Sequence, residues 1–285
     1  MLWSGGRCRP IRRDYDEEAN VTNLDEIEWK RVLWDLSDSG VLSITLNRPE
    51  RLNAVSFRTL HEVQWLVDHA GANPDVRVVT IRGQGTRSFC SGDDMKGMDP
   101  EPGVDDFHVH RRLIRSLREL PKPVVALVYG WALGHGFELA CACDFRLCAD
   151  NIEVGDHRVT RSIGMIGGSS WFLPRIIGQG RALEMLMTGS HLNAQEALDW
   201  GWANRVWPLD EFQDRAAEYV EMLAGLATVA AGGYKDAMEY SLTHTLRDSL
   251  AYEYEVSTLR VKGTDDQQEG RQSWLEKRSP TFKGR

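Results

Sequence analysis

Short apolar runs alternate with amphipathic segments through the first half of the chain. Residues 29–36 and 41–46 carry apolar side chains on either side of the turn sequence SDSG, a pattern that predicts a β-hairpin. Further apolar runs, each of the length of a buried strand, occupy the segments 76–81, 124–129 and 145–149, and a short extended piece is expected at 152–155.

Amphipathic helices are expected between these strands. Ser56 is a suitable N-cap for a helix that reaches about Ala70, and residues from about 105 to 119 have the apolar spacing of a second helix. A third, short helix is expected after the small-residue turn at 130–136. Strands that alternate with helices require crossover connections, so the sequence predicts an α/β fold with a mostly parallel sheet.

From Ser169 onward the pattern becomes helical, with one short strand expected at 203–207. We therefore divide the chain into a flexible leader (1–26), an α/β core (27–205) and a C-terminal helical region (206–285). The helical region holds many apolar residues, which we expect to be buried against the core or against neighbouring subunits.

Composition excludes several classes of protein. The 285 residues carry a formal net charge of −8, which argues against nucleic-acid binding because phosphate neutralisation needs a basic face. No apolar stretch reaches the ~18 residues that a membrane span requires. The five cysteines include no CxxC pair, so we expect no metal site, no disulfides and a reducing, cytoplasmic location.

The strongest chemical signal lies in the stretch 121–148. Its apolar strand leads into the turn 130–136 and then into a short helix in which Glu138 is the acidic residue. A carboxylate there is unfavourable for stability but well placed for proton transfer. A second glycine turn, at 89–94, follows a neighbouring strand. If both turns face one cleft, a free N–H from each can stabilise an oxyanion, although a single such turn usually only reverses the chain.

Five segments resemble the enoyl-CoA hydratase/isomerase (crotonase) family in order and spacing. They are LNRPERLNA (46–54), FCSGDD (89–94), PKPVVALVYGWALGHGFELA (121–140), CDFRLCAD (143–150) and TDDQQEGRQSWLEKRSPTF (264–282). The resemblance covers about residues 28–282. It implies a crotonase-like spiral of ββα turns, a C-terminal α-helical trimerisation region, a homotrimer or dimer of trimers, and an acyl-CoA substrate. Coenzyme A would enter as part of that substrate rather than as a bound cofactor.

The resemblance also implies roles for residues in the two turns. The oxyanion donors would be the backbone N–H groups of Asp93 and His135, in turns where Gly92 and Gly134 contact the substrate. Glu138 would be the first catalytic carboxylate. The family often has glycine or alanine at positions 93 and 135, and a backbone donor tolerates other residues if the backbone angles allow it.

Two further substrate contacts follow from position. Lys96 lies where the family wraps the adenine end of coenzyme A. Trp131 is a candidate for the acyl pocket, together with Trp171 and Phe172, although core packing is the alternative for each of these aromatic residues.

The chain departs from the family at the second catalytic acid, where it has Arg158. Asp156, His157 and Glu153 are the nearest replacements. Either Glu138 alone would activate water and deliver the proton, or Asp156 or His157 would assist it. Arginine does not donate a proton near neutral pH. We expect Arg158 either to pair with Asp156 or Glu153, or to face the cleft and hold a carboxylate or carbonyl of the acyl group.

These assignments imply an enoyl-CoA hydratase or a double-bond isomerase, the second of which needs only one proton-moving residue. A hydrolase, decarboxylase or synthase with the same oxyanion hole is a second hypothesis, because one fold supports several reactions. A non-catalytic scaffold is a third, which the intact Glu138 disfavours. His108 and His110 lie beside the stretch expected to cover the acyl chain, and we assign neither of them a catalytic role.

Overall fold

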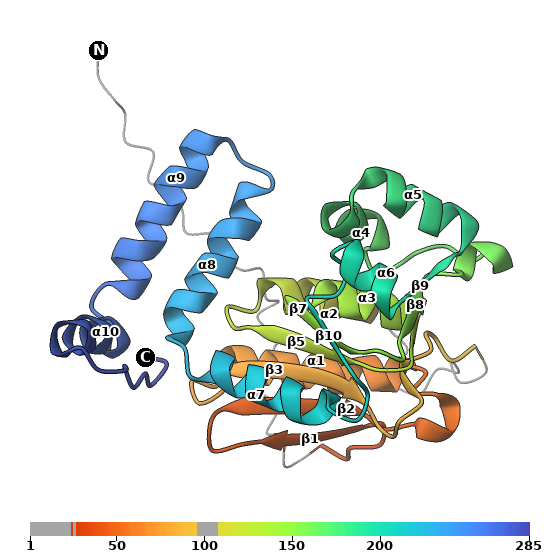
Figure 1. Ribbon diagram of the computed structural model, residues 1–285, viewed down its shortest axis with the longest axis horizontal. Helices are drawn as coiled ribbons and strands as arrows, with labels where there is room; N and C mark the ends of the chain where they lie inside the picture. The colour runs from red at the N-terminus through yellow and green to blue at the C-terminus, as the bar shows by residue number, and fades with distance from the viewer. Residues whose placement is uncertain (1–23, 25–26, 96–107) are drawn as a thin grey trace.

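The computed structural model describes residue 24 and residues 27–95 and 108–285. The expected leader lies outside the described residues apart from Leu24, as do Lys96 and positions 105–107 of the second predicted helix. The described chain forms two β-sheets with surrounding helices, and its C-terminal helices stand to one side of the sheets (Figure 1). None of the described helices combines the length and the apolar character that a membrane crossing requires.

The larger sheet within the described residues has six strands in the order β1-β2-β3-β5-β7-β10. These strands are β1 (Val32–Leu36), β2 (Val41–Leu46), β3 (Val78–Gly83), β5 (Val124–Val128), β7 (Phe145–Ala149) and β10 (Arg205–Trp207). The predicted hairpin is present as the antiparallel pair β1 and β2, and the other neighbouring strands are parallel. The prediction of an α/β fold with a mostly parallel sheet is therefore confirmed.

Four strands of three residues each form the smaller sheet of the described chain, in the order β4-β6-β8-β9. They are β4 (Ser88–Cys90), β6 (Trp131–Leu133), β8 (Glu153–Gly155) and β9 (His191–Asn193). The expectation that β4 and β6 are parts of loops and that β9 is part of a helical region is wrong. Three residues are too few to show a hydrophobic period, so these strands have no local signal.

The chain visits the two sheets in turn. After β3 and β4 it forms helix α2 (Val109–Glu119), and after β5 and β6 it forms helix α3 (His135–Ala142). Each pass thus adds one strand to each sheet and then a helix. This repetition is the ββα spiral that the family resemblance implies, and the predicted fold class is confirmed.

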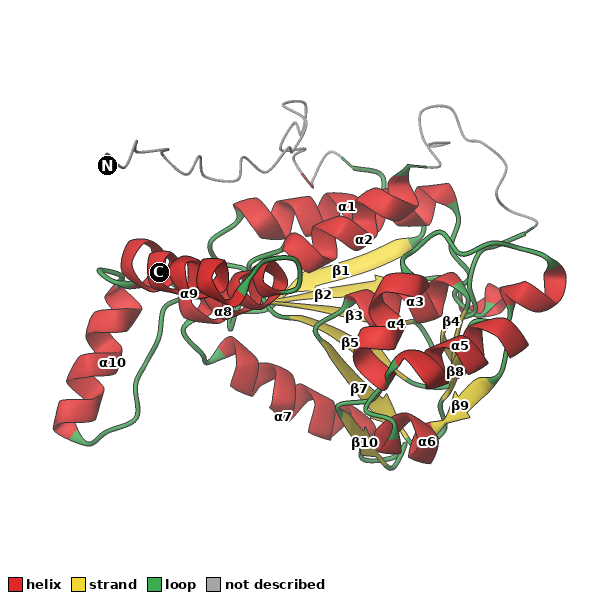
Figure 2. Ribbon diagram, turned by 90° about the horizontal axis from the view of Figure 1, so that it is seen from above, coloured by secondary structure: helices red, strands yellow, loops and turns green. Residues whose placement is uncertain are grey.

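Helices cover both faces of the larger sheet, with α1 and α2 on one side and α7 on the other (Figure 2). Helix α1 (Phe57–Ala72) begins at the predicted Ser56 cap, whose side chain accepts a hydrogen bond from the N–H of Thr59. The main hydrophobic core lies between the sheet and helices α1 to α3. A second cluster joins the opposite face to α7 (Phe212–Ala224), so packing on the sheet continues past residue 205.

The remaining helices lie beyond the spiral. They are α4 (Ser169–Ile177), α5 (Gln179–Thr188), α6 (Ala194–Asp199), α8 (Thr228–Ser241), α9 (Leu246–Glu255) and α10 (Asp265–Glu276). Helices α8 to α10 leave large apolar side chains exposed, among them Met238, Leu246 and Trp274. The strand expected near 203–207 is β10, which pairs with β7.

Candidate active site

The turn after β4 and the turn before α3 pack directly against each other. A Cβ on Gly136 would lie 2.3 Å from the carbonyl oxygen of Cys90, and a Cβ on Gly92 would lie 3.0 Å from that of Leu133. Gly92 also has a φ of 103°, a conformation that side chains disfavour. The two turns approach this closely because glycine occupies both contact positions.

The N–H groups of Asp93 and His135 lie at this junction. A Cβ on Gly92, the residue before Asp93, would be only 3.6 Å from the amide nitrogen of His135. Among the described residues, neither N–H donates to a backbone or side-chain acceptor. Because His135 is the first residue of α3, its N–H also belongs to the positive end of the helix dipole. The two predicted oxyanion donors are therefore neighbours, and no group in the described part of the chain occupies either of them.

Glu138 lies one turn into α3, and its side chain is fully buried. His135 Nδ1 is 3.4 Å from Oε2, while Ser169 Oγ and Arg158 Nη2 are 3.1 and 2.8 Å from Oε1. Burial raises the pKa of this carboxyl group, but the hydrogen bonds from His135 and Arg158 outweigh burial and lower it to about 2. Glu138 is therefore ionised at neutral pH.

Arg158 joins two buried carboxylates. Its Nε lies 2.8 Å from Asp156 Oδ1, its Nη2 contacts Asp156 Oδ2, and the same Nη2 reaches Glu138. The expected pairing with Asp156 is confirmed, whereas Glu153 instead contacts His191, with 2.7 Å between Oε1 and Nδ1. Arg158 Nη1 is buried and has no hydrogen-bond partner among the described residues. The guanidinium group thus fixes both carboxylates and retains unused N–H donors.

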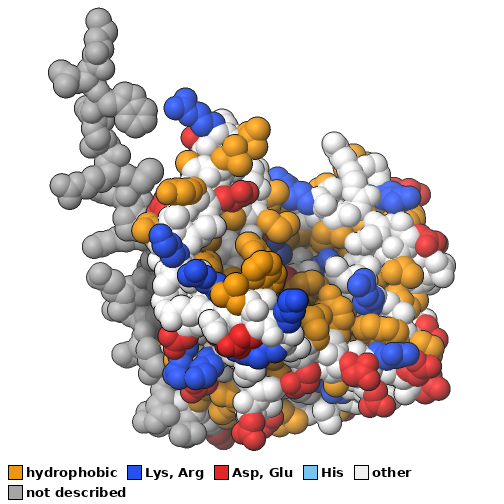
Figure 3. Space-filling view, turned by 60° about the vertical axis from the view of Figure 1, so that its left-hand side comes forward, with side chains coloured by type: hydrophobic (Ala, Val, Ile, Leu, Met, Phe, Trp, Pro, Cys, Tyr) orange, Lys and Arg blue, Asp and Glu red, His pale blue; other side chains and the backbone are white. Residues whose placement is uncertain are grey.

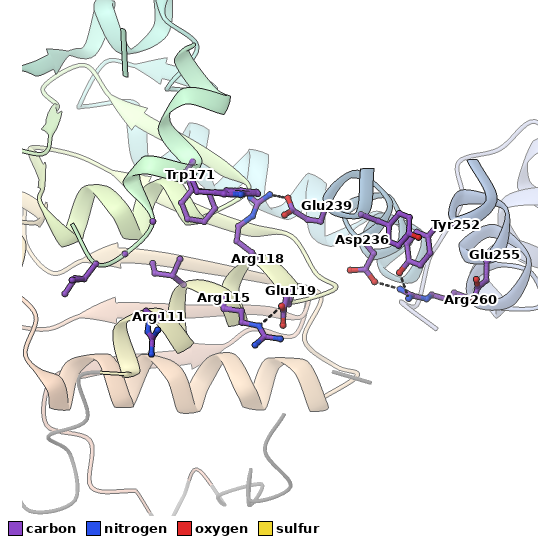
Figure 4. Close-up of a pocket in the computed structure, with 16 residues that line it drawn as sticks. Arg111, Arg115, Arg118, Glu119, Trp171, Asp236, Glu239, Tyr252, Glu255 and Arg260 are labelled. Carbon is purple, nitrogen blue, oxygen red and sulfur yellow. Dashed lines mark hydrogen bonds and ion pairs between the residues drawn. The ribbon is translucent and has the colours of Figure 1, made fainter. Parts of the chain in front are cut away.

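A cavity of about 630 Å³ lies next to this cluster, between helices α2 and α4 on one side and α8 and α9 on the other (Figure 4). Trp171, Phe172 and Gly167 are among the residues that line it. A Cβ on Gly167 would lie 2.5 Å from Oε2 of Glu138, so the carboxylate sits directly behind this part of the wall. Figure 3 shows hydrophobic side chains gathered around a hollow on one face of the molecule.

Several charged side chains of the cavity wall are paired with one another. Arg118 of α2 reaches across to Glu239 of α8 and forms an ion pair with it (Figure 4). Arg115 Nε lies 2.7 Å from Glu119 Oε1. Because these cations already have anionic partners, the wall offers aromatic and apolar surface rather than a strongly basic pocket.

The other predicted residues occupy different places. His157 lies beside His191, with 5.6 Å between ring centroids, and burial and the neighbouring His191 lower its pKa. Trp131 is the first residue of β6, and 39% of it is exposed. It is not among the described residues that line the cavity. Gly134 has a φ of 54° and caps α3, as the turn requires. Lys96 lies outside the described residues.

Sequence reasoning missed two polar residues of this cluster. Ser169 donates to Glu138 and also lies 3.3 Å from Asp156 Oδ2, but its position suggested only the start of a helix. His110 is fully buried, and its Nε2 lies 3.1 Å from Asp93 Oδ1. His110 and Asp93 are 17 positions apart in the sequence, which leaves no local pattern from which the contact could be found.

Comparison with known proteins agrees with this geometry. A family model described as enoyl-CoA hydratase/isomerase matches residues 37–285. A carnitinyl-CoA dehydratase of Proteus mirabilis is 36% identical over 86% of this chain and 96% of its own length. An (E)-benzylidenesuccinyl-CoA hydratase of Thauera aromatica is 31% identical over the same shares of the two chains.

Solved structures give the same result. The crystal structure of an enoyl-CoA hydratase from Bacillus anthracis is similar with a TM-score of 0.84 and 33% identity, and the match covers 90% of this chain and 100% of that one. A family model that spans most of the chain, relatives above 30% identity and a shared fold all point the same way. The chain belongs to the enoyl-CoA hydratase/isomerase family.

Proposed function

We propose that this protein is an enoyl-CoA hydratase, which adds water across the α,β-double bond of an acyl-CoA thioester and needs no further cofactor. The packing of the two glycine turns supports this most strongly, because it brings the N–H groups of Asp93 and His135 together one helical turn from Glu138. The thioester carbonyl oxygen would accept both N–H groups. Loss of one such donor typically costs about 3 kcal/mol in the transition state.

Glu138 performs both proton transfers in this proposal. Its carboxylate takes a proton from water while the water oxygen bonds to Cβ, and the electron pair of the double bond moves towards the thioester oxygen as an enolate. The two N–H groups and the positive end of α3 stabilise that charge. The enolate then uses its electron pair to take the proton from Glu138 at Cα, and the carboxylate is restored.

The hydrogen bonds from His135 and Arg158 to Glu138 bias these two transfers. A carboxyl group with a pKa of about 2 is a weak base and a strong acid, so it favours proton delivery to Cα over proton removal from water. Asp156 is engaged by Arg158 and Ser169, which supports a positioning role for it. The position of His157 beside His191 gives no support to an assisting role.

A second candidate rests on the unused donors of Arg158. Nη1 is buried without a partner among the described residues, which suits a second carbonyl or a carboxylate on the acyl group. A hydrolase, decarboxylase or synthase that acts on such a functionalised acyl-CoA or β-dicarbonyl would use the same oxyanion hole. A double-bond isomerase would use Glu138 alone to move a proton between carbons.

Crotonyl-CoA distinguishes these reactions. We expect the wild-type protein to remove the absorbance of the conjugated enoyl group, and we expect Glu138→Gln to reduce the rate by about 10²- to 10⁴-fold. Glu153→Gln is the matched control, because Glu153 is exposed and lies on the neighbouring strand β8. Migration of the double bond without uptake of water would assign an isomerase. Binding of CoA thioesters without reaction would favour the second candidate, and no binding at all would favour a scaffold.

We also propose that the chain assembles as a homotrimer or a dimer of trimers through its helical region, and that it works in the cytoplasm. The exposed apolar side chains of α8 to α10 support the assembly. The described cysteines, Cys90, Cys141, Cys143 and Cys148, are buried free thiols, as a reducing compartment allows. We also propose the division of the chain into a leader (1–26), a core (27–205) and a C-terminal helical region (206–285), in which α7 packs on the core. Light scattering after gel filtration tests the assembly, since a monomer would contradict it.

A further inference from the structure

The proposed oxyanion hole contains a feature that opposes its own function. Asp93 supplies one of the two N–H donors, yet the same residue carries a carboxylate that is 15% exposed. An enolate oxygen bound at the Asp93 N–H would therefore form close to a second negative charge. Like charges at short range in a poorly solvated site repel strongly, so the Asp93 side chain needs compensation.

His110 is placed to provide that compensation. It projects from the first turn of α2, is fully buried, and has its Nε2 3.1 Å from Asp93 Oδ1. Its ring packs edge-to-face on Phe57 and on His135, with centroid separations of 5.9 and 4.7 Å. Both contacts hold the ring in one orientation, with Nε2 directed at the carboxylate.

The side chains around Asp93 favour its ionised form. Burial raises the pKa of Asp93, but the hydrogen bond from His110 and the nearby His135 and Arg158 lower it overall. The Asp93 carboxylate is therefore ionised, so the site must compensate its negative charge with a hydrogen-bond donor rather than remove it by protonation. Glu138 and Asp156, the other acids of the cluster, are both bound to Arg158, which leaves His110 as the group that directly holds Asp93 among the described residues.

We propose that His110 is a positioning residue of the oxyanion hole: it binds the Asp93 carboxylate, so that the Asp93 N–H can serve an enolate oxygen without repulsion from its own side chain. This inference rests on the proposed function, because it needs an enolate at that position. His110 transfers no proton to the substrate. Its effect passes through Asp93, and removing the Asp93 carboxylate should abolish it.

Acetoacetyl-CoA provides a direct probe, because its bound enolate absorbs in the near ultraviolet and its keto form does not. The pH midpoint of enolisation on the protein measures how well the hole accepts negative charge. We expect His110→Leu to raise this midpoint by about one to two pH units, a 10- to 100-fold loss of enolate preference. His110→Gln keeps an N–H donor but loses the ring that packs on Phe57 and His135, so its midpoint should lie between those of the wild type and His110→Leu.

The Asp93→Ala background isolates the pairwise effect. Asp93→Ala should lower the midpoint, and adding His110→Leu to it should produce no further change. His108→Gln, an exposed substitution two residues away, is the control that should leave the midpoint at its wild-type value. A wild-type midpoint in His110→Leu, or an equal shift in the presence and absence of Asp93, would overturn the proposal. If His110→Leu does not fold, a wild-type midpoint in His110→Gln overturns it.

Two other outcomes are equally decisive. Asp93, His110 and His135 each offer one ligand atom, and these atoms lie within 4.8 Å of one another, so zinc titration by calorimetry belongs in the same experiment. Tight zinc binding that is lost in both His110→Leu and Asp93→Ala would assign the cluster to a metal and overturn the positioning role. A wild-type protein that binds acetoacetyl-CoA without enolising it would refute the oxyanion hole, whereas crotonyl-CoA hydration with unshifted His110 variants would refute only the role of His110.

Discussion

Replacing Arg158 with methionine tests the buried charge cluster most severely. Methionine keeps much of the aliphatic stem but removes the donors to Asp156 and Glu138. Breaking a buried ion pair by removing one partner typically costs about 3–5 kcal/mol, because the remaining charge is left uncompensated. For a chain of this size a cost of that order lowers the melting temperature by roughly 10 °C.

The loss of stability in Arg158→Met should depend on pH. In the wild type the pKa of Glu138 is held at about 2, so its contribution to stability is present above its ordinary value of 4.5 and is lost as the pH falls towards 2. Without Arg158, Glu138 loses one of the two hydrogen bonds that oppose the effect of burial, so its pKa rises from the wild-type value. The stability that its ionised form contributes is then smaller, and it is lost at a higher pH than in the wild type. The stability difference between the two proteins should therefore be larger at pH 7 than at pH 3.

Urea unfolding at fixed protein concentration measures this difference. Arg161→Met is the matched control, since Arg161 is exposed on the same turn and its replacement should change the free energy of unfolding by less than about 0.5 kcal/mol. The double variant with Glu138→Gln should recover part of the loss, because one buried charge is gone. A deficit below about 1 kcal/mol at pH 7, or one that does not vary with pH, would refute the reasoning.

Three further predictions follow from individual contacts. Gly136→Ala places a Cβ 2.3 Å from the Cys90 carbonyl oxygen and should displace the start of α3, so kcat/KM for crotonyl-CoA should fall by about 100-fold; activity within threefold of wild type would contradict this. Ser169→Ala leaves Glu138 and Asp156 with one donor fewer and should cost about 1–3 kcal/mol in urea unfolding, whereas no measurable loss would show that the hydroxyl contributes nothing. Because the pKa of Glu138 is about 2, the carboxylate stays ionised as the pH is lowered through 4.5. A pH profile of kcat/KM should therefore show no titration near pH 4.5 that can be assigned to Glu138. A loss of activity near pH 4.5 whose midpoint moves in Glu138→Asp would contradict this.

The strands of the larger sheet could be predicted because each carries enough apolar residues to show a pattern. β3 and β5 are runs of β-branched and apolar residues that fit a buried parallel strand, and the Ser56 cap marked the start of α1. The short strands β4, β6 and β9 could not be predicted, since their stability comes from pairing with strands that are distant in the sequence. Family resemblance, rather than periodicity, pointed to the spiral that joins them.

Some features of the candidate site could likewise be predicted from the sequence, whereas others depend on the fold. The turn at 130–136 and Glu138 are close in sequence, whereas the turn at 89–94 is distant, and its position beside them was inferred from the neighbouring strands and the family resemblance. Arg158 was recognised as a departure from the family, and its pairing with Asp156 was among the expected outcomes. Its contact with Glu138 depends on the fold, because the two residues lie on different passes of the spiral. The pair Asp93 and His110 depends on how α2 packs over the turn after β4, which no local pattern encodes.

The stereochemistry of hydration tests the central claim most directly. If the Glu138 carboxylate both removes a proton from water and delivers it to Cα, the oxygen and the hydrogen must enter from the same face of the double bond. Crotonyl-CoA hydrated in D₂O should therefore give 3-hydroxybutyryl-CoA with one deuterium at Cα, in the diastereomer that results from syn addition, as read by proton NMR. Anti addition, or an equal mixture of the two diastereomers, would contradict a single carboxylate at this position.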